Sequence, residues 1–197
     1  MAGSKILVIA GSAREGALSV RLAGAAAAAL SAAGAQVTPL DLRALDLPLY
    51  DGDVEAAHGV PDGARTLRNA LLANDALLLV TPEYNGFPTP LVINAFDWLS
   101  RLKPEGELPA GLGATAGKPV ALLSSSPGPL GGLRALNLMR QFLGLTIGML
   151  VVPQQFALGR AGEAFAADGA LIDAKAQQAV AGVTTALLRI SNALRAP

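Results

Sequence analysis

Three short loops rich in glycine, proline and serine carry most of the residues that could do chemistry. The first, Gly11–Ser19, contains Ser12, Arg14 and Ser19 and leads into an alanine-rich helix. Unpaired backbone N–H groups at a helix N-terminus favour an anion, and serine and arginine add further donors. The spacing matches neither a dinucleotide fingerprint nor a P-loop. The loop predicts an anion site suited to a phosphate, with an ordinary turn capped by Ser19 as the alternative.

The second and third loops have backbones adapted to a close ligand. Three prolines restrict the second loop, Thr81–Pro90, while Asn85-Gly86 permits positive φ. A stiff loop of this kind can hydrogen-bond the polar edge of a flat heterocycle; a surface turn is the alternative. The third loop, Ser124–Arg134, has small residues that let a ligand approach the backbone, or it is a flexible linker. The candidate residues of these loops are Pro82, Glu83, Tyr84, Asn85, Gly86, Ser125 and Gly128.

The composition offers few other reactive side chains. The 197 residues include no cysteine and one histidine, and the formal net charge is zero. Thiol chemistry, thiolate metal sites and multi-histidine metal sites are therefore excluded, and we expect no metal and no catalytic side chain. The balanced charge argues against a nucleic-acid-binding face. The amino-terminal stretch lacks the pattern of a signal peptide and no run predicts a membrane span, so we expect a cytoplasmic protein.

Short apolar runs alternate with longer helical segments along the chain. The expected strands are Lys5–Ala10, Gln36–Leu40, Ala76–Thr81, Val120–Ser125 and Thr146–Val152, the last ended by Pro153. The expected helices are Leu18–Ala33, a segment from Pro61-Asp62 to Ala73, Pro90–Arg101, Leu133–Leu143 and Ala174–Leu194. The remaining Asp41–Pro61, Lys103–Lys118 and Gln154–Gly169 are expected to be irregular connections.

This alternation predicts one α/β domain over residues 1–197. The expected architecture is a doubly wound, five-stranded parallel sheet of order 2-1-3-4-5, with helices on both faces. In such sheets a ligand sits beyond the carboxyl ends of the strands, near the switch point between the first and third strands. That rule selects the same three loops.

The loops also carry a resemblance to a known family. The segments Gly11–Arg14, PEYNGFPTPLVINAFDWLSR at Pro82–Arg101 and SSPGPLGGLRAL at Ser125–Leu136 resemble the NADPH-dependent FMN reductase family. This flavodoxin-like family includes quinone, azo-dye and chromate reductases. The resemblance implies FMN as cofactor and NADPH or NADH as electron donor.

The resemblance also implies roles for the loop residues. Ser12 and Arg14 match the positions that hold the FMN phosphate, Pro82–Asn85 those that line the isoalloxazine ring, and Ser125–Gly132 a segment near the flavin or its substrate. Three positions depart from the family pattern: Ala17 replaces a common serine, Ser19 a common asparagine, and Ile93 a common lysine. Ser19 stays a candidate for the phosphate, and the departures imply weaker FMN binding.

The implied function is a ping-pong NAD(P)H oxidoreductase. Electrons would pass from NAD(P)H through FMN to a quinone, azo, chromate or free-flavin acceptor, in a homodimer or homotetramer. The alternatives are a flavodoxin-type electron carrier, an FMN-binding protein without NAD(P)H oxidation of its own, and an interaction protein with a decayed site. Flavodoxins are usually strongly acidic, so the neutral charge favours the reductase.

Several conspicuous residues have plainer interpretations. The single histidine, His58, is expected to be a solvated loop residue. For Glu83 the backbone is expected to matter more than the carboxylate. Trp98 is expected to pack in the core, with a dimer face as the alternative, and Arg134 either reaches an anionic ligand or lies on a helix surface.

Overall fold

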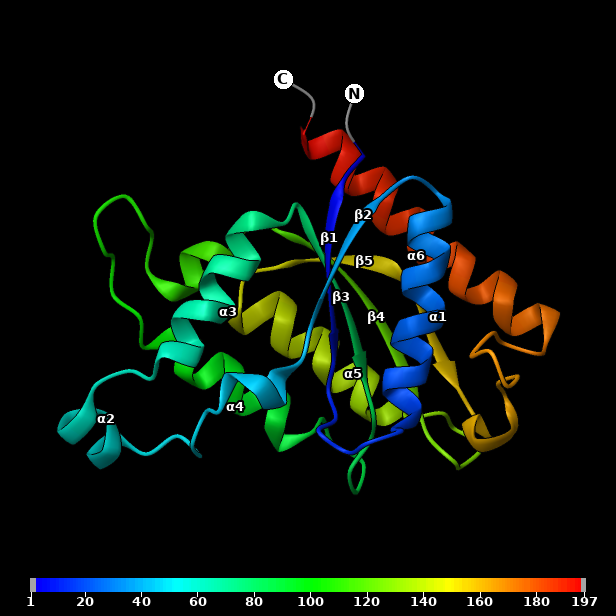
Figure 1. Ribbon diagram of the computed structural model, residues 1–197, viewed down its shortest axis with the longest axis horizontal. Coiled ribbons are helices and arrows are strands. Elements are labelled where there is room, and N and C mark those ends of the chain that lie inside the picture. Colours follow the sequence, from blue (N-terminus) through cyan, green and yellow to red (C-terminus); the bar gives the residue numbers. More distant parts are fainter. Residues whose placement is uncertain (1–2, 196–197) are drawn as a thin grey trace.

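The computed structural model describes residues 3–195, so the outermost residues of the expected domain lie outside the described part. Five parallel strands pair in the order β2-β1-β3-β4-β5, which confirms the predicted topology (Figure 1). The strands are β1 (Lys5–Ala10), β2 (Gln36–Leu40), β3 (Ala76–Thr81), β4 (Pro119–Ser125) and β5 (Leu150–Leu158). The α-helices are α1 (Leu18–Ala32), α2 (Gly52–His58), α3 (Asp62–Ala73), α4 (Pro90–Ser100), α5 (Leu133–Gln141) and α6 (Ala174–Arg195).

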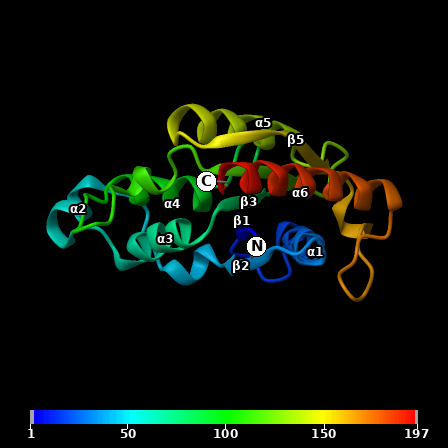
Figure 2. The same cartoon turned by 90° about the horizontal axis from the view of Figure 1, so that it is seen from above.

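Two apolar layers cover the two faces of the sheet. One layer packs α1 and α6 against residues such as Val8 and Leu78, and the other packs α3, α4 and α5 against residues such as Leu7 and Leu79. Figure 2 separates these groups, with α1 and α6 on the right and α3 and α4 on the left. Because both faces are buried, β3 and β4 consist almost entirely of buried residues, as expected for central parallel strands.

The registers of the central strands align the carboxyl ends of β1, β3 and β4. Ala10 of β1 pairs with Val80 of β3, and Thr81 of β3 pairs with Ser124 of β4. Each of these residues is at or next to the last position of its strand. The three candidate loops therefore leave the sheet at one level of its carboxyl edge.

The fifth strand differs from the prediction of a strand over Thr146–Val152 ended by Pro153. β5 starts later, at Leu150, and continues through Pro153 to Leu158. The pairing with β4 shifts register between Val120 and Leu122, which face Val151 and Gln155. A proline is tolerated in a bulged edge strand because its missing N–H removes no regular ladder bond. The extended strand also replaces part of the irregular Gln154–Gly169 segment, where a short 3₁₀ turn, η4 (Ala161–Glu163), follows.

Other connections are more ordered than the sequence indicated. The Asp41–Pro61 connection contains the 3₁₀ turn η1 (Leu42–Leu45) and α2, and the Lys103–Lys118 connection contains η2 (Gly111–Ala114). α5 stops at Gln141 and passes into a π-helical turn, η3 (Phe142–Thr146). His58 is exposed at the end of α2, and no helix of residues 3–195 is long and apolar enough to cross a membrane.

Trp98 is fully buried, as the packing interpretation predicts. Its indole N–H donates to the carbonyl oxygen of Pro48 at 2.7 Å, and the Asn94 amide donates to the same oxygen at 2.8 Å. Asn94 also accepts a bond from the backbone N–H of Tyr50. These bonds fasten the segment before α2 onto α4.

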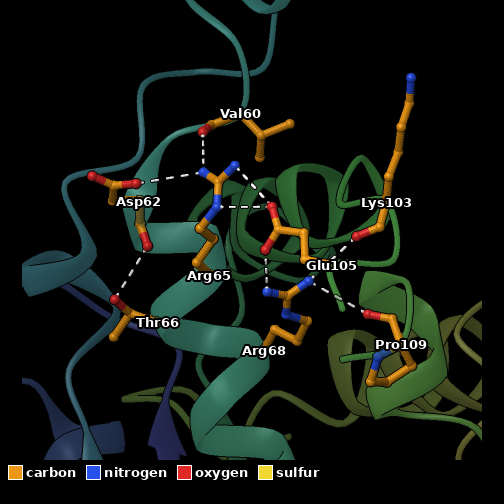
Figure 3. A network of polar contacts seen from close by, with 8 residues as sticks. All are labelled: Val60, Asp62, Arg65, Thr66, Arg68, Lys103, Glu105 and Pro109. Atoms are coloured by element: carbon orange, nitrogen blue, oxygen red, sulfur yellow. Dashed lines mark hydrogen bonds and ion pairs between the residues drawn. The ribbon is translucent and has the colours of Figure 1, made fainter. Parts of the chain in front are cut away.

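An arginine of α3 anchors the loop that follows α4 (Figure 3). Arg68 is 1% exposed, and its Nη2 donates to Oε2 of Glu105 at 2.6 Å. Its Nη1 lies 3.4 Å from the carbonyl oxygens of Lys103 and Pro109. Arg65 reaches the other oxygen of the Glu105 carboxylate at 3.1 Å. Removing the carboxylate would leave a buried guanidinium without its charged partner.

We therefore expect Glu105→Gln to lower the free energy of unfolding near pH 7. The pKa of Glu105 is held below its ordinary value of 4.5, first by the hydrogen bond from Arg68 and then by that from Arg65. Such a group contributes stability above its unfolded-state pKa and loses it as the pH falls through the folded-state pKa. The urea unfolding free energies of wild type and variant should converge as the pH falls through this folded-state pKa, which lies below 4.5.

Glu107→Gln, in the same loop, is the matched control and should open no such gap. A difference between wild type and Glu105→Gln that does not shrink at any pH as the solution is acidified from pH 7 would contradict the ionic origin of the effect.

Candidate functional site

The first loop is held close to the sheet and to α4. The backbone N–H of Gly11 donates to Val80 at 2.8 Å, and Oγ1 of Thr89 donates to the carbonyl oxygen of Gly11 at 2.7 Å. A Cβ at position 11 would lie 2.7 Å from Cγ2 of Val92, so only glycine allows this approach. Thr89 occupies the predicted N-cap position of α4, yet its hydroxyl makes this bond and does not cap the helix.

The N-terminus of α1 is open for an anion. The N-cap residue is Ala17, and no side chain caps the helix, so the alternative in which Ser19 acts only as a cap is wrong. Ser19 is 1% exposed, and its hydroxyl has no hydrogen-bond partner among residues 3–195. Ser12 is also nearly buried, and its Oγ accepts the backbone N–H of Arg14 at 3.2 Å. The Arg14 side chain is exposed beside them.

The second loop closes in a tight turn. Tyr84 and Phe87 exchange two backbone hydrogen bonds, of 2.9 and 3.0 Å. The two residues between them, Asn85 and Gly86, have φ of 53° and 85°, the combination that a two-residue turn of this hand requires. The rings of Tyr84 and Phe87 are 49% and 64% exposed. The turn therefore presents two aromatic side chains at the carboxyl edge of the sheet.

Glu83 joins the second loop to the third. Its carboxylate is 8% exposed and forms an ion pair with Nη2 of Arg134. The same carboxylate accepts Nε of Arg134 at 3.0 Å and the backbone N–H of Ala135, in the first turn of α5, at 3.2 Å. The hydrogen bond from Arg134 is the main cause that lowers the pKa of Glu83. The carboxylate therefore orders the start of α5, and the expectation that the Glu83 backbone matters more to a bound ligand stays a prediction.

The third loop folds back against the end of β5. Oγ of Ser124 donates to Gly131 at 2.8 Å, and the backbone N–H of Ser126 donates to Leu158 at 3.2 Å. A Cβ at Gly131 would lie within 2.7 Å of the backbone at residues 157–159, which explains a glycine there. Ser125 is 1% exposed, and its hydroxyl has no hydrogen-bond partner in the described part of the chain. Gly128 lies on the exposed part of the loop.

The candidate residues thus lie on three segments that are bonded to one another. Thr89 links the first and second loops, and Glu83 links the second and third. Sequence reasoning missed the role of Thr89, although the Thr-Pro pair marked it as the start of a helix. It left Arg134 undecided, because the partner of a long side chain is set by the fold.

Two buried hydroxyls test whether these residues fit a flavin nucleotide. A buried hydroxyl without a partner costs free energy, so native proteins satisfy nearly all of them. Ser19 lies at the open N-terminus of α1 and Ser125 at the end of β4, and both lack partners among the described residues. A phosphate and a polar heterocycle would supply acceptors at these ends. The donor set therefore fits FMN.

The Glu83–Arg134 pair can be tested by a double-mutant cycle of Glu83→Gln and Arg134→Ala. Since each single change breaks the same charge-assisted bonds, the combined loss of stability near pH 7 should be smaller than the sum of the two single losses. The pKa of Glu83 is lowered, so this coupling should fade as the pH drops through the folded-state pKa, below 4.5. Urea unfolding measures it, and strictly additive losses would show that the pair contributes no interaction energy.

Comparisons with known proteins agree with this geometry. The chain is 39% identical to quinone reductase of Escherichia coli K12 over 114 residues, a match that spans only 56% of that relative and 58% of this chain. It is 36% identical to an NAD(P)H-dependent FMN reductase of Pseudomonas aeruginosa over 181 residues, 89% of both chains. The fold is similar to that of FerB, a flavoenzyme NAD(P)H:acceptor oxidoreductase of Paracoccus denitrificans, with TM-score 0.79 and 27% identity over 96% of this chain and 98% of that one.

Residues 4–163 also match the NADPH-dependent FMN reductase family as a whole, and they contain all three loops with the bonds that join them. The chain belongs to the NADPH-dependent FMN reductase family.

Proposed function

We propose that this chain binds one FMN non-covalently at the carboxyl edge of the sheet. With that cofactor it acts as an NAD(P)H-dependent reductase of a quinone, azo compound, chromate or free flavin. The observation that carries the proposal is the pair of buried, unpartnered hydroxyls, Ser19 and Ser125, on two loops that are tied to a third. The relatives named as quinone and FMN reductases support the same class of activity.

The phosphate is assigned to the first loop. Ser12, Ser19 and the uncapped backbone N–H groups of α1 supply donors, and Arg14 supplies the positive charge. Ala17 removes one hydroxyl that the family commonly has, so Arg14 carries a larger share of the binding free energy.

The flavin ring is assigned to the second and third loops. Pro82, Asn85 and Gly86 shape the turn, and Tyr84 contributes an exposed aromatic ring. Ser125 and Gly128 are assigned to the opposite side of the flavin ring. Glu83 acts here through Arg134 and α5, because its carboxylate is already occupied by these donors. When bound, FMN supplies the redox chemistry that lets donor and acceptor use one site in turn. The protein's part is to bind and orient its ligands.

A homodimer or homotetramer in the cytoplasm stays a prediction from the family resemblance. The electron acceptor is best found by a steady-state screen of NADH and NADPH against a quinone, an azo dye, chromate and free FMN. NAD(P)H oxidation by the purified protein without a partner reductase separates the reductase from an electron carrier. A protein that gains neither flavin absorbance nor thermal stability on addition of FMN would overturn the proposal.

Arg14→Ala tests the phosphate assignment. Losing a charge-assisted hydrogen bond to the phosphate should weaken FMN binding by about 1.5–3 kcal/mol, or about 10- to 150-fold. The quenching of flavin fluorescence in a titration gives the dissociation constant. Riboflavin, which lacks the phosphate, should bind wild type and variant alike.

Arg189→Ala is the matched control, since Arg189 is an exposed arginine of α6. It should leave the FMN dissociation constant within about twofold of wild type, as expected for a distant surface substitution. An unchanged FMN affinity in Arg14→Ala would contradict the assigned phosphate site.

A further inference from the structure

A groove with a cavity volume of about 570 Å³ runs between α1 and the edge strand β2. Val8, Ala10 and Pro39 line it from the sheet, Ala23 and Ala27 line it from α1, and Arg14 and Arg43 stand at its rim. We name it the α1–β2 groove. α1 and β2 lie next to each other in Figure 1, both in blue shades. The volume is within the range of small-molecule sites, about 300–1,000 Å³.

The interior of the α1–β2 groove suits a flat ring. Val8 pairs with Pro39 in the parallel register, so both side chains project on the α1 side of the sheet. The α1 wall consists of the small residues Ala23, Gly24 and Ala27 together with the exposed Val20, so a planar group can lie against the helix beside the Val20 side chain. From Leu18, its first residue, to Ala27 the helix advances about 14 Å at 1.5 Å per residue. That length accommodates a nucleoside.

The rim of the groove is suited to an anion. Nη1 of Arg43 donates to the carbonyl oxygen of Ala13 at 3.4 Å, which holds its guanidinium beside the first loop. Within residues 3–195, neither Arg14 nor Arg43 forms an ion pair with a carboxylate. Two carboxylates also line the groove, Asp41 and Glu15. Oδ1 of Asp41 accepts the backbone N–H of Arg43 at 2.9 Å and caps η1, and Glu15 is exposed and forms no ion pair within residues 3–195. The guanidinium of Arg43 therefore keeps donors for a ligand.

The groove is continuous with the first loop, because Ser12, Ala13 and Gly16 line its end at the carboxyl edge of the sheet. A ligand in the groove therefore reaches the loop assigned to the FMN phosphate. An adenylate combines a flat ring with phosphates, and NADPH joins an adenylate to the group that must meet the flavin. Its 2′-phosphate is the anion that NADH lacks.

We propose that the α1–β2 groove binds the adenylate part of NADPH and that Arg43 binds the 2′-phosphate. Arg43 is then the residue that makes the enzyme prefer NADPH to NADH. Arg14 remains assigned to the FMN phosphate, so each of the two arginines binds a different phosphate. This inference rests on the proposed function, because it takes NADPH as a substrate of the neighbouring flavin site.

Binding to the FMN-loaded protein tests the groove without any turnover. Isothermal titration should show that 2′,5′-ADP binds wild type about 10- to 100-fold more tightly than AMP, the range of a charge-assisted hydrogen bond. Arg43→Ala should abolish this preference, while Arg189→Ala, on α6, should keep it. Equal affinities for 2′,5′-ADP and AMP in wild type, or an undiminished preference in Arg43→Ala, would overturn the proposal. Tighter binding of 3′,5′-ADP than of 2′,5′-ADP would point to coenzyme A chemistry and would also overturn it.

A second variant tests the apolar wall. Ala27→Phe places a ring in the deep end of the groove and should weaken both 2′,5′-ADP and AMP at least about tenfold, since a flat ligand loses its space. Ala181→Phe, at an exposed position of α6, is the matched control and should leave both affinities unchanged. Unaltered nucleotide binding in a folded Ala27→Phe protein would place the adenylate elsewhere.

Steady-state kinetics gives the final readout. The ratio of kcat/KM for NADPH to that for NADH should fall about 10- to 100-fold in Arg43→Ala, because only NADPH carries the lost phosphate contact. An unchanged ratio would overturn the inference. Nucleotide binding that behaves as expected in a protein without NAD(P)H oxidation would refute the proposed function and leave the groove assignment standing. Normal NAD(P)H oxidation with an unchanged kcat/KM ratio would refute the groove assignment and leave the proposed function standing.

Discussion

The parallel register of β1, β3 and β4 is the constraint on which the candidate site depends. Because Ala10 pairs with Val80 and Thr81 with Ser124, three loops leave the sheet at the same level. Parallel strands need long crossovers, and the helices in those crossovers bury both faces of the sheet. The carboxyl edge is then the place where backbone groups are still free, so the chemistry of this chain gathers there.

Register alone would leave three independent loops, and two polar contacts join them. Thr89 holds the first loop against the start of α4, and Glu83 holds the turn of the second loop against the start of α5. Both contacts use a side chain at one loop to satisfy a backbone group at another. A ligand that needs several loops at once then meets them already ordered, which lowers the entropic cost of binding.

The sequence predicted the central part of the fold closely and its margins less well. β1 and β3 have the predicted bounds, since unbroken apolar runs between turn residues identify strands that are buried on both faces. β5 was misplaced because Pro153 was taken as its end, whereas a bulge in an edge strand admits it. The contacts of the Glu83 carboxylate could not be predicted for a different reason. Its partners lie 51 and 52 residues away in the chain, and no local pattern reports such a contact.

The N-terminus of α1 has no capping side chain. A capping serine or aspartate at position 17 would stabilise the helix by about 1 kcal/mol, and the chain has Ala17 there. The buried hydroxyl of Ser19 likewise has no hydrogen-bond partner among the residues that the structure describes. Both features oppose stability locally, and they occur in the first turn of one helix, beside a free arginine and the mouth of the α1–β2 groove. The FMN phosphate proposed for the first loop would complete the hydrogen bonding that the protein leaves unmade at this point.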